Sequence, residues 1–178
     1  MHRRLVFISF VVLLAASAWG QMSMTPGPEV KKLDYFAGSW TTECTIAQGP
    51  WGMGGKFTSN ATSEWMPGNF FVRSQGESQM PPELGGGDKR LTVMGYDTQA
   101  NTYTSDTYSS GGQHESSKGT LTGGDTWTWN ATANYGGMDI QQKLTIKTLS
   151  PTSYNMKFEI SMDGKNWSTF MEGKATKK

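Results

Sequence analysis

Apolar and polar residues alternate with a period of two along most of this chain, and short segments rich in glycine and proline interrupt the alternation. The clearest run places Tyr154, Met156, Phe158, Ile160 and Met162 on one face and polar residues on the other. One apolar and one polar face is typical of an antiparallel strand, and no stretch keeps a helical apolar period for three turns. The pattern therefore predicts an all-β protein.

Turn signals divide the chain into ten predicted strands with short connections. The dipeptides Pro67-Gly68 and Asp163-Gly164 are typical of hairpin turns. A ten-strand meander exposes two sheet edges unless it closes, so we expect a closed antiparallel up-and-down barrel, with a two-sheet sandwich as the competing fold. Residues 28–36 are expected to form a short helical turn before the barrel. The predicted strands are residues 39–48, 56–66, 69–78, 89–97, 101–109, 113–122, 125–133, 140–149, 153–162 and 167–175.

The first twenty residues differ in character from the rest of the chain. A short basic segment precedes an apolar stretch from Leu5 to Ala16, and small residues follow up to Gly20. This is the pattern of a secretory signal peptide, whose apolar core is too short to span a bilayer. We therefore expect a secreted or periplasmic protein with a signal peptide over residues 1–20, a flexible N-terminal segment over 21–32 and a single barrel domain over 33–178.

The net charge of the chain argues against some classes of binding partner. Removing residues 1–20 takes away two arginines and no acidic residue, which leaves 14 basic against 15 acidic residues, a net charge of about −1. This balance argues against a nucleic-acid partner or an anionic membrane surface. No other apolar run approaches membrane-spanning length, so we expect no stable membrane insertion after signal cleavage. The oligomeric state stays open.

Residues that could carry catalysis or bind a metal are few. Beyond residues 1–20, His114 is the single histidine, and its neighbour Glu115 falls on the opposite face of the predicted strand. No nucleophile and base are therefore visibly paired. Cys44 is the single cysteine, expected to be buried and inert, and the sequence has no ligand cluster typical of zinc or calcium. We expect no enzyme activity, no metal site and no cofactor.

The composition of the predicted interior leaves two alternatives open. After residue 20 the chain has 13 branched aliphatic residues against 18 aromatic residues and 10 methionines. Several positions on the apolar side, such as Ser59, Ala61 and Ser63, are small. A wide barrel built this way either keeps a cavity for a ligand or is filled by rings and thioethers.

Strand parity predicts where such a cavity opens. In an up-and-down meander, the connections around residues 48–55, 79–88, 110–112 and 134–139 fall at one end. They are long or rich in glycine and carry large apolar side chains, which suits a mobile lid, although flexible surface loops have the same composition. The candidate ligand-binding residues at this mouth and in the interior are Trp51, Met53, Trp65, Met80, His114, Trp127, Trp129, Tyr135, Met138 and Met156.

An ordered set of motifs resembles a known family. The set consists of residues 33–40 with Gly38-x-Trp40, residues 64–70, residues 94–97 and residues 161–167. It is similar to an exported bacterial family of unknown function with a lipocalin-like (calycin) barrel. The resemblance implies the fold, export, and structural roles for Gly38 and for Trp40, whose ring would close one barrel end. Haem-binding relatives of this barrel carry a late histidine, whereas none follows His114 here.

Three functions agree with these observations. The first is an exported barrel that binds a small, partly apolar or aromatic molecule. The second is a non-enzymatic envelope interaction or stress module with a solid core. The third, which has least support, is an enzyme that acts at the barrel mouth.

Overall fold

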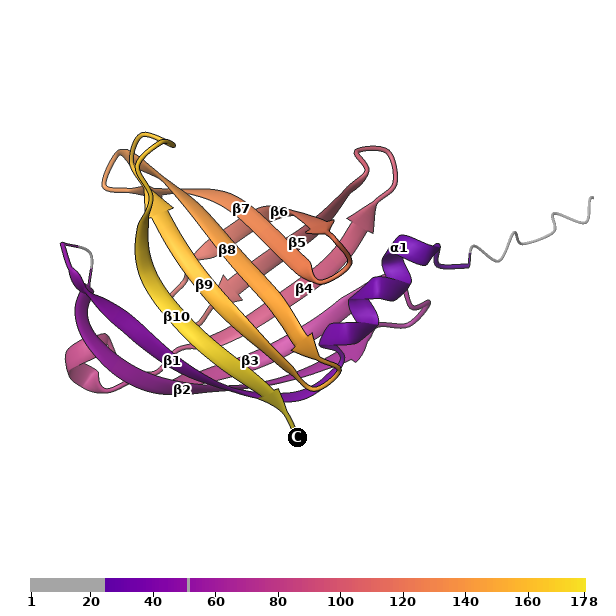
Figure 1. Cartoon of the computed structure of the whole chain (residues 1–178), viewed down its shortest axis with the longest axis horizontal. Helices are drawn as coiled ribbons and strands as arrows, with labels where there is room; N and C mark the ends of the chain where they lie inside the picture. Colours follow the sequence, from indigo (N-terminus) through magenta and orange to yellow (C-terminus); the bar gives the residue numbers. More distant parts are fainter. Residues whose placement is uncertain (1–24, 51) are drawn as a thin grey trace, which may run out of the picture.

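The computed structural model describes residues 25–50 and 52–178, which form a closed antiparallel barrel (Figure 1). Each strand pairs with the next along the chain, and β1 pairs with β10 to close the sheet. The predicted ten-strand barrel is confirmed, and closure excludes the two-sheet sandwich. The strands are β1 (Gly38–Gly49), β2 (Gly52–Trp65), β3 (Val72–Gln79), β4 (Lys89–Asp97), β5 (Thr102–Ser109), β6 (His114–Thr122), β7 (Thr126–Tyr135), β8 (Met138–Ser150), β9 (Ser153–Ser161) and β10 (Ser168–Lys177).

Two of the predicted mouth loops are continuations of strands. Gln48 pairs with Met53 in the β1–β2 hairpin, and Asn134 pairs with Asp139 in the β7–β8 hairpin. The latter turns on Gly136–Gly137 alone, whose φ angles of +61° and +90° favour glycine. The segments expected to be loops over residues 48–55 and 134–139 are therefore largely strand, because glycine-rich segments can complete a backbone ladder without apolar side chains. Their role as a lid stays a prediction.

Strand register fixes which residues face the interior. Trp40 and Cys44 on β1 are buried, and Trp40 pairs with Ala61 on β2, which in turn pairs with Gly76 on β3. Side chains of paired residues share a face of the sheet, and the face alternates along each strand. The inward set can therefore be followed around the whole barrel from these pairs.

The end of the barrel where β1 begins is sealed by an N-terminal plug. The plug consists of α1 (Pro28–Lys31) and the 3₁₀ helix η1 (Lys32–Phe36), which lies across this end in Figure 1. Residues 28–32 of the segment expected to be flexible are thus helical, and Val30 is buried. Residues 21–24 and the predicted signal peptide lie outside the described residues. The core at this end is formed by Leu33, Phe36, Val72, Tyr103, Trp127, Trp129 and Ile146.

Four aromatic side chains of the closed end have hydrogen-bonded polar tips. Trp40 Nε1 donates to the carbonyl of Phe36 at 2.9 Å, and Trp65 Nε1 donates to Asp34 Oδ1 at 2.9 Å. The hydroxyl of Tyr103 donates to Glu29 Oε2 at 2.8 Å. The hydroxyl of Tyr35 donates to the carbonyl of Ser153 at 2.9 Å. Each ring buries apolar area while its tip is satisfied, so the plug is fixed to both sides of the barrel.

Within residues 25–50 and 52–178, no helix has the length and apolar character needed to cross a membrane.

Candidate ligand site inside the barrel

The barrel end opposite the plug is open. The connections β1–β2, β3–β4, β5–β6, β7–β8 and β9–β10 lie at this end, as strand parity predicted. Inward-facing residues on this side of the core, among them Thr107, Glu115, Ala131 and Ala133, are only partly buried. Solvent therefore reaches the interior from this end.

The inner wall formed by β2 to β6 is lined by hydroxyl groups that form hydrogen bonds within the wall. Paired inward positions on neighbouring strands are occupied by serine and threonine, so their side chains meet across the ladder. The bonds are Ser63 Oγ to Ser74 Oγ at 2.9 Å, Thr92 Oγ1 with Thr107 Oγ1 at 2.9 Å, and Ser117 Oγ to the Ser105 carbonyl at 3.3 Å. This wall is polar but leaves few groups in need of a partner.

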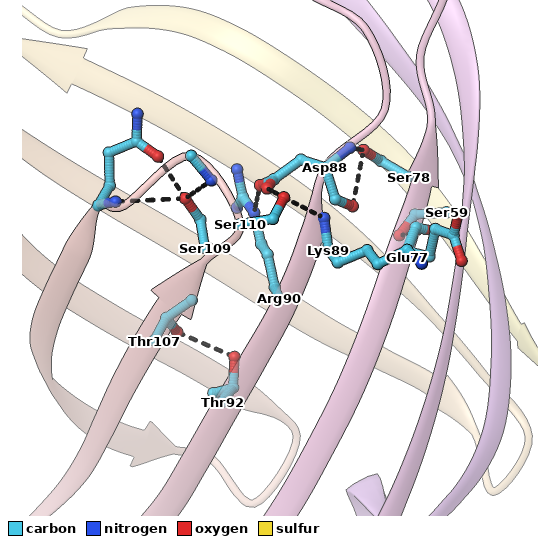
Figure 2. Close-up of polar contacts among 12 residues, drawn as sticks. Ser59, Glu77, Ser78, Asp88, Lys89, Arg90, Thr92, Thr107, Ser109 and Ser110 are labelled. Carbon is cyan, nitrogen blue, oxygen red and sulfur yellow. Dashed lines mark hydrogen bonds and ion pairs between the residues drawn. The ribbon is translucent and has the colours of Figure 1, made fainter.

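Asp88 forms hydrogen bonds with three segments at the rim of the open end (Figure 2). Its Oδ2 accepts from Arg90 Nε at 2.6 Å, its Oδ1 accepts from Ser110 Oγ at 2.9 Å, and its backbone N–H donates to Ser78 Oγ at 3.0 Å. Desolvation raises the pKa of Asp88, but the hydrogen bonds from Arg90 and Ser110 outweigh it and lower that pKa below its ordinary value. Asp88 thus holds β4 and the β5–β6 connection through its carboxylate and β3 through its backbone N–H.

The opposite part of the rim holds a small pocket. A pocket of about 230 Å³ lies between β8, β9 and the β9–β10 connection, with the buried Ile140 and Ile160 in its lining. Asp163 stabilises this connection, because its Oδ1 accepts from the backbone N–H groups of Lys165 at 2.8 Å and Asn166 at 2.7 Å. These bonds hold the pKa of Asp163 well below its usual range.

Gln142 is the next inward-facing residue on β8 below Ile140, and it pairs with Ile160 on β9. Its side chain is 5% exposed. Among the described residues, its Oε1 is the one buried side-chain nitrogen or oxygen without a hydrogen-bond partner. An unmet buried acceptor costs about 1–3 kcal/mol.

Glu115 on β6 is a second acceptor in the interior. It pairs with Thr107 and shares its face of the sheet with the buried Ser117. Burial raises the pKa of Glu115, and the more distant charge of Arg90 opposes this only in part. Within the part of the chain that the structure describes, Glu115 forms no ion pair, since Arg90 is held by Asp88.

The floor of this region is aromatic. Trp129 lies below Ala131 on β7 and is stacked with Trp127, with ring centroids 6.1 Å apart and planes 5° apart. The Trp129 ring lies against Gly119 of β6, where an added Cβ would be 2.5 Å from a ring carbon. Glycine at this position lets the indole lie flat on the wall and form the floor.

The structure places the predicted site residues in three different regions. Trp127 and Trp129 are buried in the floor, and Trp65 and Met156 pack against the same cluster. Met53 and Met138 are exposed on hairpins of the open end, and Met80 is half-buried after β3. Trp51 and the side chain of Tyr135 lie outside what the structure describes.

His114 lies on the outer face of the barrel. Its ring stacks on Tyr108 with centroids 4.6 Å apart, and its Nε2 lies 3.3 Å from Asp106 Oδ1. The structure therefore does not bring His114 to the interior residues. Sequence reasoning missed Glu115 and Gln142 as site residues, although alternation places both on the inward face.

A larger, open groove of about 540 Å³ runs over β2 to β5. Its lining includes Asn60, Gln75, Leu91 and Tyr108, whose positions in the register face away from the interior. The groove is therefore a feature of the outer surface. It contains no buried side-chain atom without a partner, in contrast to the interior around Gln142.

Comparison with known proteins places the chain in a family. A model of proteins of unknown function, DUF1579, matches residues 25–177. The chain belongs to the DUF1579 family. The expected membership of a family of unknown function with this barrel is thereby confirmed, while export remains a proposal. No curated protein matches this DUF1579 chain.

Two solved structures are similar to this DUF1579 protein. The S-type phycobiliprotein lyase CPES from Guillardia theta has a TM-score of 0.59 and 11% identity, covering 83% of this chain and 91% of that chain. Because the identity is low, this similarity shows the fold alone, which is a lipocalin-like barrel. EF1p2_mFAP2b bound to DFHBI has a TM-score of 0.36 and 15% identity, covering 84% of this chain and 98% of that chain. That score does not establish a shared fold.

Proposed function

We propose that this protein binds a small, partly apolar molecule inside the open end of its barrel. The observation that carries the proposal is the open end of the barrel, where inward-facing residues such as Ala131 and Ala133 are only partly buried above the stacked Trp127 and Trp129. The activity is binding, without chemical conversion of the ligand.

The surrounding side chains support a ligand of moderate size. Ala131 and Ala133 leave the β7 wall open, and the stacked Trp129 and Trp127 below them provide an aromatic floor. Apolar walls with a few placed polar groups are the usual composition of small-molecule sites. A ligand seated here would lie between the hydroxyl-lined wall and the apolar wall.

Export belongs to the same proposal, supported by the basic and apolar pattern of residues 2–20. N-terminal sequencing of the protein from its own cells, after separation of envelope and cytoplasm, tests it. We expect an envelope or secreted protein that begins at Gln21. A cytoplasmic protein that retains Met1 would contradict export and leave the binding proposal unchanged.

Filling the interior tests the binding proposal. N-phenyl-1-naphthylamine, a neutral dye that fluoresces in apolar surroundings, is titrated into the protein. The variant Ala131→Phe places a ring in the interior, whereas Asn130→Phe places the same ring on the outer face of the same strand. We expect saturable binding by the native protein and by Asn130→Phe, and at least a tenfold loss in Ala131→Phe.

Circular dichroism and thermal melts establish that both variants are folded. Equal dye binding by the native protein and both variants would contradict the proposal, because the dye would then bind at the surface. An absence of saturable binding by the native protein would favour a barrel with a solid core.

A further inference from the structure

We propose that the ligand carries a hydroxyl group on an apolar ring system. The hydroxyl bonds to Thr92 and Thr107, and the ring system lies against the opposite wall of the barrel. This inference rests on the function proposed above and names the chemistry of the ligand. It follows from the unlike character of two opposite walls in the open half of the barrel.

The two walls belong to strands on opposite sides of the barrel. In the order of the closed sheet, β4 and β9 are five steps apart in either direction. Each strand has an inward methionine that packs against the core, Met94 on β4 and Met156 on β9. The next inward residue toward the open end is Thr92 on β4 and Phe158 on β9. A hydroxyl group and an aromatic ring therefore stand on opposite walls above the same core.

The threonines of the polar wall are accessible from the interior. Thr92 and Thr107 are paired on β4 and β5, and their hydroxyls bond each other at 2.9 Å (Figure 2). Both residues are half-buried, whereas Ser105, the next inward residue of β5 toward the plug, is buried. The greater exposure of the threonines therefore comes from the open half of the interior.

The threonine pair keeps hydrogen-bonding capacity for a ligand. Two hydroxyl groups together have two O–H donors and four acceptor sites. Their mutual bond uses one donor and one acceptor site, so one O–H and three acceptor sites are left. Glu115, which pairs with Thr107, adds a further acceptor to this wall. A ligand hydroxyl, which both donates and accepts, matches this capacity.

The opposite wall is apolar. Phe158 is half-buried and lies edge-on against Phe170, with ring centroids 6.0 Å apart. Ile160, the next inward residue of β9, lines the rim pocket of about 230 Å³. Barrels of about eight strands already have room for one small ligand, and ten strands enclose a wider interior. A ring system on this wall buries apolar surface while its hydroxyl points toward β4.

A matched pair of ligands tests the inference. 4-Cyclohexylphenol and 4-cyclohexyltoluene have nearly the same shape and differ by a hydroxyl in place of a methyl group. Competition with N-phenyl-1-naphthylamine at neutral pH, where the phenol is uncharged, measures both affinities. A purely apolar site would favour the toluene, because burying an unpaired hydroxyl is unfavourable. We expect the phenol to bind the native protein at least as tightly as the toluene.

Paired substitutions assign this preference to the two threonines. Thr92→Val with Thr107→Val removes both hydroxyls and keeps the shape, which changes stability little when both partners of a hydrogen bond are replaced. In this variant the phenol should bind at least tenfold more weakly than the toluene. Thr128→Val with Thr145→Val is the matched control, because these threonines are paired on β7 and β8 and face outward. It should leave both affinities unchanged.

Phe158→Ala tests the apolar wall. Because both ligands contact this wall through the same ring system, the variant should weaken both by a similar factor and leave the ratio of their affinities unchanged. A loss confined to the phenol would contradict the proposed orientation.

Thermal melts and circular dichroism establish that each variant is folded. Tighter binding of the toluene than of the phenol by the native protein would overturn the inference, as would a ratio of affinities that the Thr92 and Thr107 substitutions leave unchanged. If both ligands then still displace the dye from the native protein, the proposed function stands with a ligand of other chemistry. If the dye itself shows no saturable binding, the proposed function fails and the inference fails with it.

Discussion

Single aromatic residues determine how firmly the closed end of the barrel is sealed. Trp40 is 4% exposed, its ring packs on Tyr154 at 5.0 Å between centroids, and its Nε1 bonds the last residue of η1. Trp40→Ala removes the ring and leaves a cavity, so we expect a loss of about 3–5 kcal/mol in the free energy of unfolding. Urea melts measure it.

Trp167 supplies the control for this change. It is only partly buried and lies under the ammonium of Lys143, 4.2 Å from the ring centroid. Contacts of this kind at exposed sites contribute about 0.5–1 kcal/mol. Trp167→Ala should therefore cost much less than Trp40→Ala, and equal losses would show that Trp40 does not hold the plug.

Two inward-facing glycines allow a test of the aromatic floor. An added Cβ at Gly119 would lie 2.5 Å from the Trp129 ring, whereas at Gly76 the nearest atom would be 3.5 Å away. Gly119→Ala must displace the indole and should cost about 1–3 kcal/mol, as overpacking does, with a change in near-ultraviolet circular dichroism. Gly76→Ala should be close to neutral, and a similar loss in both would refute the described floor.

The residues of the candidate site were predicted unevenly, for a physical reason. Rings such as Trp127 and Trp129 stand out by size and alternation, and the structure places both in the interior. Glu115 and Gln142 follow the same alternation. The sequence, however, does not show whether a polar side chain on an inward face has a hydrogen-bond or ion-pair partner. That Gln142 Oε1 has no partner among the described residues depends on the packed side chains around it, which local sequence patterns do not contain.

At the scale of elements, the plug depends on packing. α1 and η1 comprise four and five residues, too short to be stable alone, and neither has a side-chain N-cap. Leu33 in η1 is 0% exposed, so Leu33→Ala should cost about 2–5 kcal/mol. Lys31→Ala, on the exposed side of α1, should be within about 0.5 kcal/mol of the native protein in the same melts.

Equal stability of the Leu33→Ala and Lys31→Ala variants would contradict the plug as a stabilising element. It would mean that the barrel is stable with the end unsealed.

The strands could be predicted well because apolar and polar residues alternate along a strand that is buried on one face only. Alternation such as that of residues 154–162, together with turn signals along the chain such as Pro67-Gly68 and Asp163-Gly164, indicates ten strands without any contact information. The hairpin ends were missed since Gly52, Gly54 and Gly136 have no side chain to alternate. Their backbone pairing depends on the partner strand, which local patterns do not contain.

At the scale of the whole molecule, buried weak acids predict how stability depends on alkaline pH. Burial raises the pKa of Cys44 from 9.0 to about 11 and that of Tyr154 from 10.0 to about 12. Both groups are neutral in the folded protein at a pH where the unfolded chain has lost their protons. Stability is therefore fully present below about pH 9 and falls as the pH rises toward 11–12.

Unfolding in urea at several pH values between 7 and 11 measures this loss. Cys44→Ala should flatten the part of the curve that begins near pH 9, whatever its effect at neutral pH. A free energy of unfolding that stays constant up to pH 11 would show that these groups are not buried as described.

Native mass spectrometry of the protein purified from its own cells detects whether the open interior holds a small molecule. We predict a complex heavier than the polypeptide by one small molecule, released on denaturation and absent from Ala131→Phe purified in the same way. A native protein with the mass of its polypeptide alone, or an added mass retained by Ala131→Phe, would contradict binding in the interior.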